Sequence, residues 1–331
     1  MLDRLFSPRS IAVIGASKTV GKVGYLTLSN LVQSGFQGPI VPINSAGGEL
    51  FGLPVYKQLA DYPDAIDLVV IAVPAEMVPA AASEAVAKKA GAVVVVASGF
   101  KEAGPEGRAL EDELIAICRR GGVRLLGPNC LGVINTAIRM NASFSRRIPQ
   151  AGSMAIFSQS GALCTAMMDI ADERELGVSK AISIGNKADI TEVDVLEALA
   201  EDEDTKVIVG YLEDISDGDR FVKAAEAASN RKPVVILKAG TTTAGSRAAA
   251  NHTGVLVGKD TAYGAAFKRA GICRADTFDA LFDSATALAL QPTPKGDRVL
   301  IITNSGGSGT ISADAVEKAG LTVATLGEEL A

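Results

Sequence analysis

Short, continuous hydrophobic runs alternate with longer segments of helical period through the first part of the chain. The runs consist mainly of aliphatic residues and lack the polar alternation of strands that have one solvated face. Each run leads into turn residues and then into a helical pattern, which is the order of βα units. The runs lie at residues 11–16, 39–43, 67–73, 92–98 and 123–127. The pattern predicts an α/β domain with a doubly wound parallel sheet over residues 1–147.

The same alternation restarts after a less regular stretch. New hydrophobic runs lie at residues 153–158, 180–185, 206–212, 233–240 and 271–275, and they predict a second α/β domain over residues 148–292. The segment 291–297 contains two Pro and one Gly, which is typical of a linker. About one βα unit follows, at residues 293–331. One such unit has too little apolar surface for a core of its own, so we expect it to be the incomplete start of a third α/β domain.

Composition excludes several classes of protein. The chain has 331 residues and a net charge of −6, without the basic runs that a nucleic-acid-binding surface requires. No hydrophobic run approaches the roughly 20 residues of a transmembrane helix. The first residues lack the apolar segment and cleavage site of a secretory signal. The sequence therefore predicts a cytoplasmic globular protein that binds neither nucleic acid nor membrane.

Cysteine and histidine are sparse. The four cysteines, Cys118, Cys130, Cys164 and Cys273, show no CxxC spacing, and His252 is the single histidine of the chain. A structural zinc site needs four such ligands at suitable spacing. We therefore expect neither a metal site nor a disulfide framework.

A glycine-rich turn follows the first predicted strand. Gly15, Ala16 and Ser17 end the strand, and Gly21 and Lys22 precede the first long helix. Backbone N–H groups in such a turn, together with a helix N-terminus, can face a phosphate. The alternative is a tight turn that serves only helix–sheet packing.

The turn departs from the dinucleotide-binding fingerprint. Ala16 replaces the middle glycine, and the second strand leads into Asn44 rather than into the Asp or Glu that would hold a ribose 2′-hydroxyl. This argues against an NAD-dependent oxidoreductase. A neutral strand end tolerates a phosphorylated ribose, as in coenzyme A.

Further loops follow the other strands of the first domain. In an open parallel sheet the ligand crevice lies outside the carboxyl ends of the strands, where these loops converge. Cys130 suggests a nucleophile, but no histidine lies near it in the sequence, and a small buried thiol is the more ordinary interpretation. The candidate cofactor contacts in these loops are Val73, Pro74, Ser98, Gly99, Phe100, Asn129 and Cys130.

Two serine- and glycine-rich turns occur later in the chain. Ser158, Ser160, Gly161 and Ala162 lie between a strand and a helix, whose N-terminus could hold an anion without a lysine. The alternative is an ordinary serine N-cap. Gly306, Gly307 and Gly309 form a similar turn in the third unit, for which a flexible loop is the alternative.

His252 lies in a segment of small residues punctuated by glycines, after a predicted strand. Imidazole suits proton transfer or covalent capture of a phosphoryl group. A lone histidine is also often an ordinary surface residue. Glu213, at the end of another predicted strand, could orient one ring nitrogen while the other attacks.

Seven motifs together resemble the NDP-forming acyl-CoA synthetases, the superfamily of succinyl-CoA synthetase and ADP-forming acetate–CoA ligase. They cover nearly the whole chain in order, and the sequence is most similar to acetate–CoA ligase alpha subunits. The motifs are IAVIGAS with GKVGY, GFKEAGPEG, LLGPNCLGVIN, FSQSGAL, SIGNKADI, AANHTGVLVG and TNSGGSGT.

The resemblance implies a Rossmann-like CoA-binding domain, a flavodoxin-like domain and the start of a further ligase domain. His252 matches the phosphohistidine, Glu213 the carboxylate that steadies it, and Ser160 to Ala162 the phosphate-binding helix start. Gly306 to Gly309 resembles a second phosphate helix. The implied reaction converts acyl-CoA, phosphate and ADP or GDP into a small carboxylic acid, CoA and ATP or GTP, through an acyl phosphate and phospho-His252.

The family also requires an ATP-grasp part, which binds the nucleotide with Mg²⁺, and nothing in this sequence resembles one. We therefore expect a beta subunit or a downstream region to supply it, within an oligomeric assembly. A non-catalytic CoA- or acyl-CoA-sensing module of an acyltransferase is the alternative function. The presence of both His252 and Glu213 disfavours it.

Overall fold

The computed structural model describes residues 2–253, 260–292 and 294–326. The chain divides into two compact units, Met1–Ala289 and Leu290–Ala331, and the described residues of each are considered by themselves. Within the described residues, no helix combines the length and the hydrophobicity needed to cross a membrane.

The first sheet of the larger unit has five strands, and all of its neighbouring pairs are parallel. Their order, β2-β1-β5-β6-β7, reverses direction between β1 and β5. Each hydrophobic run predicted in the first domain contains one of these strands. The strands are β1 (Ile11–Ile14), β2 (Ile40–Ile43), β5 (Leu68–Ile71), β6 (Ala92–Val95) and β7 (Arg124–Leu126).

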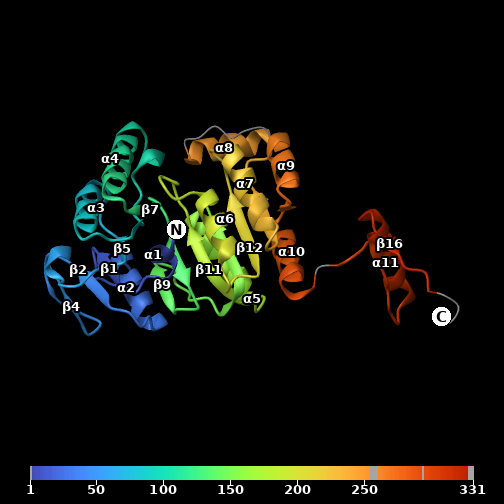
Figure 1. Cartoon of the computed structure of the whole chain (residues 1–331), viewed down its shortest axis with the longest axis horizontal. Helices are drawn as coiled ribbons and strands as arrows, with labels where there is room; N and C mark the ends of the chain where they lie inside the picture. Colours follow the sequence, from blue (N-terminus) through green and yellow to red (C-terminus); the bar gives the residue numbers. More distant parts are fainter. Residues whose placement is uncertain (1, 254–259, 293, 327–331) are drawn as a thin grey trace. The chain divides into compact units, whose positions relative to one another are not determined.

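Helices cover both faces of this sheet (Figure 1). Val13 packs in one core with Leu28 of α2 (Val23–Ser34). The next strand residue, Ile14, packs on the other face with Val78 of α3 (Val78–Ala87) and Leu114 of α4 (Pro105–Gly121). Because both faces are buried, the strands need no polar alternation. The short elements around this sheet are α1 (Asp3–Phe6), β3 (Gly48–Leu50), β4 (Leu53–Val55), η1 (Leu59–Asp61), η2 (Ala75–Met77) and η3 (Lys101–Ala103).

The second sheet has seven strands in the order β14-β13-β12-β10-β11-β8-β9. The five neighbouring strands β14, β13, β12, β10 and β11 are parallel. The hairpin of β8 and β9 then pairs with β11 in the antiparallel direction. The strands are β8 (Gly132–Asn135), β9 (Met140–Ser143), β10 (Ala151–Ser158), β11 (Val178–Ser183), β12 (Val207–Leu212), β13 (Val234–Lys238) and β14 (Cys273–Ala275).

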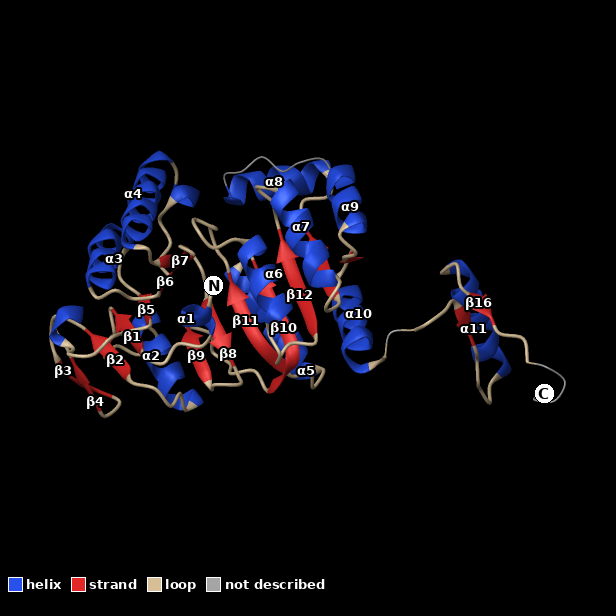
Figure 2. Ribbon diagram, viewed as in Figure 1, coloured by secondary structure: helices blue, strands red, loops and turns tan. Residues whose placement is uncertain are grey.

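Helices also cover both faces of the second sheet (Figure 2). The cores divide them into α6, α7 and α9 on one face and α5 and α10 on the other. Their bounds are α5 (Gly161–Glu173), α6 (Glu192–Glu201), α7 (Gly218–Ser229), α9 (Asp260–Arg269) and α10 (Phe278–Leu290), and α8 (Thr243–Thr253) lies between β13 and α9.

The change from one sheet to the other does not fall at the expected boundary near residue 147. The hairpin β8–β9, at residues 132–143, already belongs to the second sheet. Asn30 of α2 donates from Nδ2 to the carbonyls of Ser143 and Ser145, at 2.8 and 2.7 Å, in a buried contact. The two sheets therefore form one compact unit with a shared core rather than two separate bodies.

The described residues of the smaller unit form one βαβ element. β15 (Arg298–Val299) pairs in parallel with β16 (Thr322–Val323), and α11 (Gly306–Lys318) connects them. Ile302 and Ile311 are 88% and 73% exposed, so this unit leaves large apolar side chains in solvent. That agrees with the expectation that one βα unit cannot bury a core of its own.

Candidate active site

The strand order predicts a ligand site at the carboxyl ends of β1 and β5, where the direction of winding reverses. Gly15 follows β1 with a φ of +89°, in the left-handed region that favours glycine. A Cβ at this position would lie 2.4 Å from the carbonyl oxygen of Ala72, which follows β5. The turn after β1 thus packs against the loop after β5 so closely that only glycine fits.

Helix α2 approaches this turn equally closely. A Cβ on Gly24 would lie 2.0 Å from the carbonyl oxygen of Gly15. Gly21 and Lys22 are exposed, and Lys22 is the N-cap residue of α2, without a side-chain hydrogen bond at that cap. The first N–H groups of a helix have no intrahelical partner. This helix start is therefore available to an anionic group.

The variant Gly15→Ala is expected to lose about 3 kcal/mol of unfolding free energy, because it combines left-handed strain with overpacking. The affinity for CoA should fall by more than about tenfold, since the turn must shift. Urea unfolding and calorimetric titration measure the two effects. Gly218→Ala is the matched control, because a Cβ on Gly218 meets nothing within 4 Å. Unchanged CoA affinity in Gly15→Ala would remove this turn from the binding site.

Asn44 holds two loops together. Its Nδ2 donates to the carbonyl of Ala16 at 2.7 Å, and its Oδ1 accepts from the backbone N–H of Ala46 at 2.9 Å. Ser17 is half-buried, and its Oγ accepts from the N–H of Thr19 at 3.0 Å. The strand end therefore presents a neutral amide, already hydrogen-bonded, where an NAD-binding site would need a carboxylate.

The loops after β5 and β6 lie at the same sheet edge. Pro74 and Ser98 are exposed, and Val73 and Gly99 are half-buried. Phe100, by contrast, is fully buried in the core that contains α3 and α4. The cofactor contact predicted at Phe100 is therefore limited to its backbone.

Cys130 likewise turns its side chain into the core. It is 2% exposed, and its thiol donates to the carbonyl of Val95 at 3.3 Å. Burial raises the pKa of this thiol to about 12. A thiol that stays protonated is a poor nucleophile, so the buried-thiol interpretation of Cys130 fits the structure.

A second cluster forms at the carboxyl end of β10. Ser158 Oγ donates to the carbonyl of Ser160 at 2.7 Å and accepts from its N–H at 3.1 Å. Ser160 is the N-cap of α5, and its Oγ accepts from the N–H of Leu163 at 3.3 Å. The serines thus shape the turn, while Gly161 and Ala162 supply the first-turn N–H groups that have no intrahelical partner.

This helix start lies next to one of the candidate cofactor loops. A Cβ on Gly161 would lie 3.4 Å from the backbone nitrogen of Leu131, which directly follows Asn129 and Cys130. The loop after β7 therefore ends where α5 begins. A ligand that lies along the first sheet's carboxyl edge can reach the α5 N-terminus, whose dipole favours an anion.

Glu213 is positioned by the same sheet edge. It follows β12, the neighbour of β10, and is 6% exposed. Its backbone N–H donates to Gln159 Oε1 at 2.9 Å, so the strand end is tied to the turn that precedes α5. The hydroxyl of Tyr211 donates to Glu213 Oε1 at 3.4 Å, and burial followed by the charge of Glu213 raises the pKa of Tyr211.

His252 belongs to helix α8, and its side chain lies outside the described residues. Thr242 Oγ1 accepts from the N–H of Gly245 at 3.0 Å, which caps the start of this helix. Helix α8 follows β13, the neighbour of β12, and contacts η3 in the loop after β6. Because β10, β12 and β13 are parallel neighbours, the predicted phosphohistidine helix follows the same sheet edge as Glu213 and the α5 N-terminus, and it contacts a candidate cofactor loop.

A buried polar network lies beneath this edge and was not predicted. Lys187 Nζ lies 3.0 Å from Asp214 Oδ2 and 3.2 Å from Glu192 Oε2, with all three side chains at most 4% exposed. Gln159 Nε2 also donates to Asp214 Oδ1. Lys187 lies in the motif SIGNKADI, just after a predicted strand. That position at a strand end is the sequence signal that could have identified Lys187.

Burial alone would raise the pKa of Asp214, but Lys187 and the hydrogen bond from Gln159 hold it below its ordinary value. Asp214 therefore stabilises the fold at pH values above its unfolded pKa of about 3.9, and this contribution is lost as the pH falls through the folded pKa.

The variant Asp214→Asn should lower the free energy of unfolding by about 3 kcal/mol at pH 7. Its urea midpoint should also depend less on pH below about 4 than that of the wild type. Asp219→Asn, at an exposed site, is the control, and a wild-type stability in Asp214→Asn would contradict the assignment.

The amide of Asn186 connects the two sheets at the same place. Its Nδ2 donates to Glu102 Oε2 at 2.6 Å and to Glu111 Oε2 at 2.7 Å. Asn129 Nδ2 donates to Asn186 Oδ1 at 3.3 Å. Glu102 Oε1 in turn accepts from the N–H of Gly99 at 2.6 Å. The backbone N–H of Gly99, a candidate cofactor contact, is therefore already hydrogen-bonded. These carboxylates lie in GFKEAGPEG and helix α4, where the sequence indicated only a loop and a helix.

The remaining predicted phosphate turn belongs to the smaller unit. Gly306, Gly307 and Gly309 form the first turn of α11, and Ser305 caps it by accepting from the N–H of Ser308 at 3.4 Å. The turn is therefore an ordered helix start rather than a flexible loop. It has the same serine N-cap as α5.

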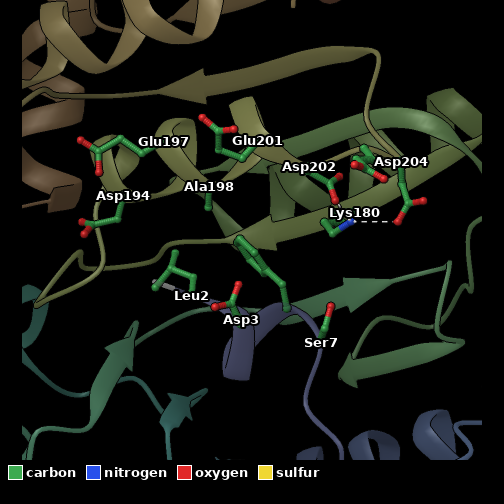
Figure 3. Close-up of a pocket in the computed structure, with 12 residues that line it drawn as sticks. Leu2, Asp3, Ser7, Lys180, Asp194, Glu197, Ala198, Glu201, Asp202 and Asp204 are labelled. Atoms are coloured by element: carbon green, nitrogen blue, oxygen red, sulfur yellow. Dashed lines mark hydrogen bonds and ion pairs between the residues drawn. The ribbon is translucent and has the colours of Figure 1, made fainter. Parts of the chain in front are cut away.

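An acidic cavity of about 500 Å³ lies away from these groups (Figure 3). Asp194, Glu197 and Glu201 of α6 line it, and Asp3 of α1 lies across from them. Lys180 Nζ is paired with Asp202 Oδ1 at 2.6 Å. Asp202 precedes β12, so the cavity is at the amino ends of the strands, opposite the edge that holds Glu213. It plays no part in the candidate active site.

Comparisons with known proteins agree with this arrangement. Residues 9–136 match the family model of a CoA binding domain, and residues 151–288 match that of a succinyl-CoA ligase like flavodoxin domain. The chain is 44% identical over 324 residues to the alpha subunit of ADP-forming acetate–CoA ligase I of Pyrococcus furiosus, and covers 70% of it. It is also 44% identical to ADP-forming acetate–CoA ligase I of Archaeoglobus fulgidus, of which it spans 47%.

The fold agrees with a solved structure over nearly the whole chain. Dinucleotide forming acetyl-coenzyme A synthetase 1 of Candidatus Korarchaeum cryptofilum, in complex with phosphate and ADP, matches with a TM-score of 0.96 and 40% identity. The match covers 99% of this chain and 71% of that one. The predicted Rossmann-like and flavodoxin-like folds are thereby confirmed. The chain belongs to the family of ADP-forming acid–CoA ligases.

Proposed function

We propose that this chain is the CoA-binding, phosphohistidine-carrying part of an ADP-forming acid–CoA ligase. It would interconvert acyl-CoA, phosphate and ADP with a carboxylic acid, CoA and ATP, the acid being acetate or another small acid. The relatives named as acetate–CoA ligases support this choice of acid. An ATP-grasp subunit or domain would hold ADP with Mg²⁺. We retain the division into CoA-binding residues 1–147, of which the hairpin at residues 132–143 pairs with the second sheet, flavodoxin-like residues 148–292 and a further ligase unit at residues 293–331. The cytoplasmic location is also part of this proposal.

The observation that carries the proposal is the convergence of four parts at one edge. The loop after β7 ends at the α5 N-terminus, Gln159 ties that turn to Glu213, and helix α8 with His252 follows the adjacent strand. A CoA loop, an anion site, a buried carboxylate and an imidazole-bearing helix are the parts that phosphoryl transfer from an acyl phosphate requires.

The chemistry then proceeds in three steps. A phosphate oxygen attacks the thioester carbonyl, the C–S bond breaks, and CoA leaves as the thiolate, which takes a proton. A ring nitrogen of His252 attacks phosphorus, the P–O bond to the acyl group breaks, and the carboxylate leaves. An oxygen of ADP then takes the phosphoryl group from the histidine. The α5 N–H groups stabilise the negative charge of the transferred group, and Glu213 accepts a hydrogen bond from the other ring nitrogen.

Calorimetric titration of the chain with CoA, acetyl-CoA and NAD in parallel tests the first half of the proposal. We expect CoA and acetyl-CoA to bind and NAD to give no heat, because the neutral end of β2 at Asn44 offers no carboxylate to a ribose. Binding of NAD alone would contradict the proposal. A non-catalytic CoA-sensing module would also bind CoA, and it is separated from a ligase by phosphorylation of His252.

A further inference from the structure

A buried lysine lies beside Glu213 and has not been assigned a role. Lys238 is the last residue of β13 and is 4% exposed. Its Nζ donates to the carbonyl of Glu213 at 2.7 Å and also to the carbonyl of Ala239. The ammonium lies 4.2 Å from the ring centroid of Tyr263, a cation–π distance. Its contacts therefore come from three different segments.

Two of these segments flank, in the sequence, the one that carries His252. Glu213 follows β12, Ala239 begins the connection from β13 to α8, and Tyr263 lies on α9, after that connection. The ammonium thus contacts a residue on each side of the segment 240–262, and also the backbone of the candidate catalytic carboxylate. Arg274 Nη2 also donates to Asp260 Oδ1 at 2.6 Å, which fastens the start of α9 to β14.

The charge of Lys238 contributes to these contacts. Burial lowers the pKa of Lys238 to about 8, so it is mainly protonated at pH 7. The charged groups that face it are Glu213 and Asp214 after β12, Asp260 on α9 and Arg274 on β14. A buried ammonium is costly unless its donors are satisfied, and here two carbonyls and an aromatic ring satisfy them.

We propose that Lys238 is a positioning residue of the phosphohistidine site, which fixes Glu213 relative to both flanks of the segment that bears His252. This inference rests on the proposed function, because it assigns Glu213 as the partner of His252. Lys238 acts through the placement of the Glu213 backbone and of α9, without contact to the reacting atoms.

The test uses the single histidine of the chain, whose imidazole gives one Hε1 NMR signal in an untagged protein. A carboxylate partner favours the charged imidazole, so Glu213→Gln should lower the midpoint of the imidazole titration by about 1 pH unit. The same substitution is then made in a Lys238→Met background. If Lys238 holds Glu213 in place, Glu213→Gln should shift the midpoint by less than half as much there.

The outcomes separate the two proposals. Equal Glu213→Gln shifts in the wild-type and Lys238→Met backgrounds would overturn the positioning role of Lys238. They would mean that the charge of Lys238 acts on the imidazole only through space, since such a charge leaves the effect of Glu213 unchanged. If Glu213→Gln does not shift the midpoint in the otherwise wild-type chain, which keeps Lys238, the pairing of Glu213 with His252 itself would be overturned.

If Lys238→Met does not fold, Tyr263→Leu and Tyr263→Phe replace it. The ring of Phe keeps the cation–π contact, so only the Leu variant should reduce the Glu213→Gln shift, and equal shifts in both would overturn the inference.

Discussion

The variant His252→Asn is expected to abolish acid-labile phosphorylation of the chain by acetyl phosphate, with a loss on the order of 10⁴-fold or more. The chain has one histidine, so no second imidazole can take the phosphoryl group. Asparagine is polar and of similar size but has no nucleophilic ring nitrogen. Incubation with labelled acetyl phosphate, followed by acid and alkali treatment of the protein, measures the effect.

Cys273→Ala is the control for this experiment. Among the four cysteines of the chain, Cys118, Cys130 and Cys164 are buried and Cys273 is exposed. An exposed thiol could attack acetyl phosphate at the carbonyl carbon, which takes the acetyl group and releases phosphate. Its removal shows that loss of the phosphoryl donor to the thiol does not set the yield of phosphorylation. Label that persists in His252→Asn would assign phosphoryl capture to another residue.

Glu213→Gln is expected to slow the phosphorylation of His252 by about 10² to 10³-fold, the range of general acid–base and orienting groups. The amide keeps the shape of the carboxylate but removes the charge that stabilises the imidazolium as the phosphoryl group arrives. CoA affinity should not change, because Glu213 follows β12 in the second sheet and the candidate CoA-binding loops follow strands of the first. Rapid-quench labelling and calorimetry measure the two quantities.

Glu226→Gln provides the matched substitution at an exposed position of α7, and it should leave both quantities unchanged. A Glu213→Gln variant that is phosphorylated at the wild-type rate would contradict the role of this carboxylate. Reduced CoA affinity would instead indicate that the variant disturbs the sheet.

The sequence was most informative where a strand is buried on both faces. Val13 and Ile14 point to opposite sides of their sheet, and each has helices to pack against, so an unbroken aliphatic run predicts both the strand and its covered environment. The loops that follow such strands share one edge of the sheet, which is why the turns at Gly15, Ser160 and Glu213 were predicted from their positions alone.

Contacts between distant segments were not predictable. The hairpin β8–β9 joins the second sheet through pairing with β11, although residues 132–143 lack a clear strand pattern. Asn186 hydrogen-bonds to Glu102 and Glu111, far away in the sequence. Phe100 and Cys130 lie in candidate cofactor loops, yet their side chains turn into the core. No local pattern encodes which way a loop side chain points, because tertiary packing decides it.

The proposed function requires this chain to capture a phosphoryl group on His252 from an acyl phosphate that forms from acyl-CoA. The most direct measurement is incubation of the untagged chain with acetyl-CoA and ³²P-phosphate, with both the released CoA thiol and the acid-labile, alkali-stable label quantified. We expect one label per CoA released, located on His252 and absent from His252→Asn. Saturating binding of acetyl-CoA with no label on the histidine would contradict it.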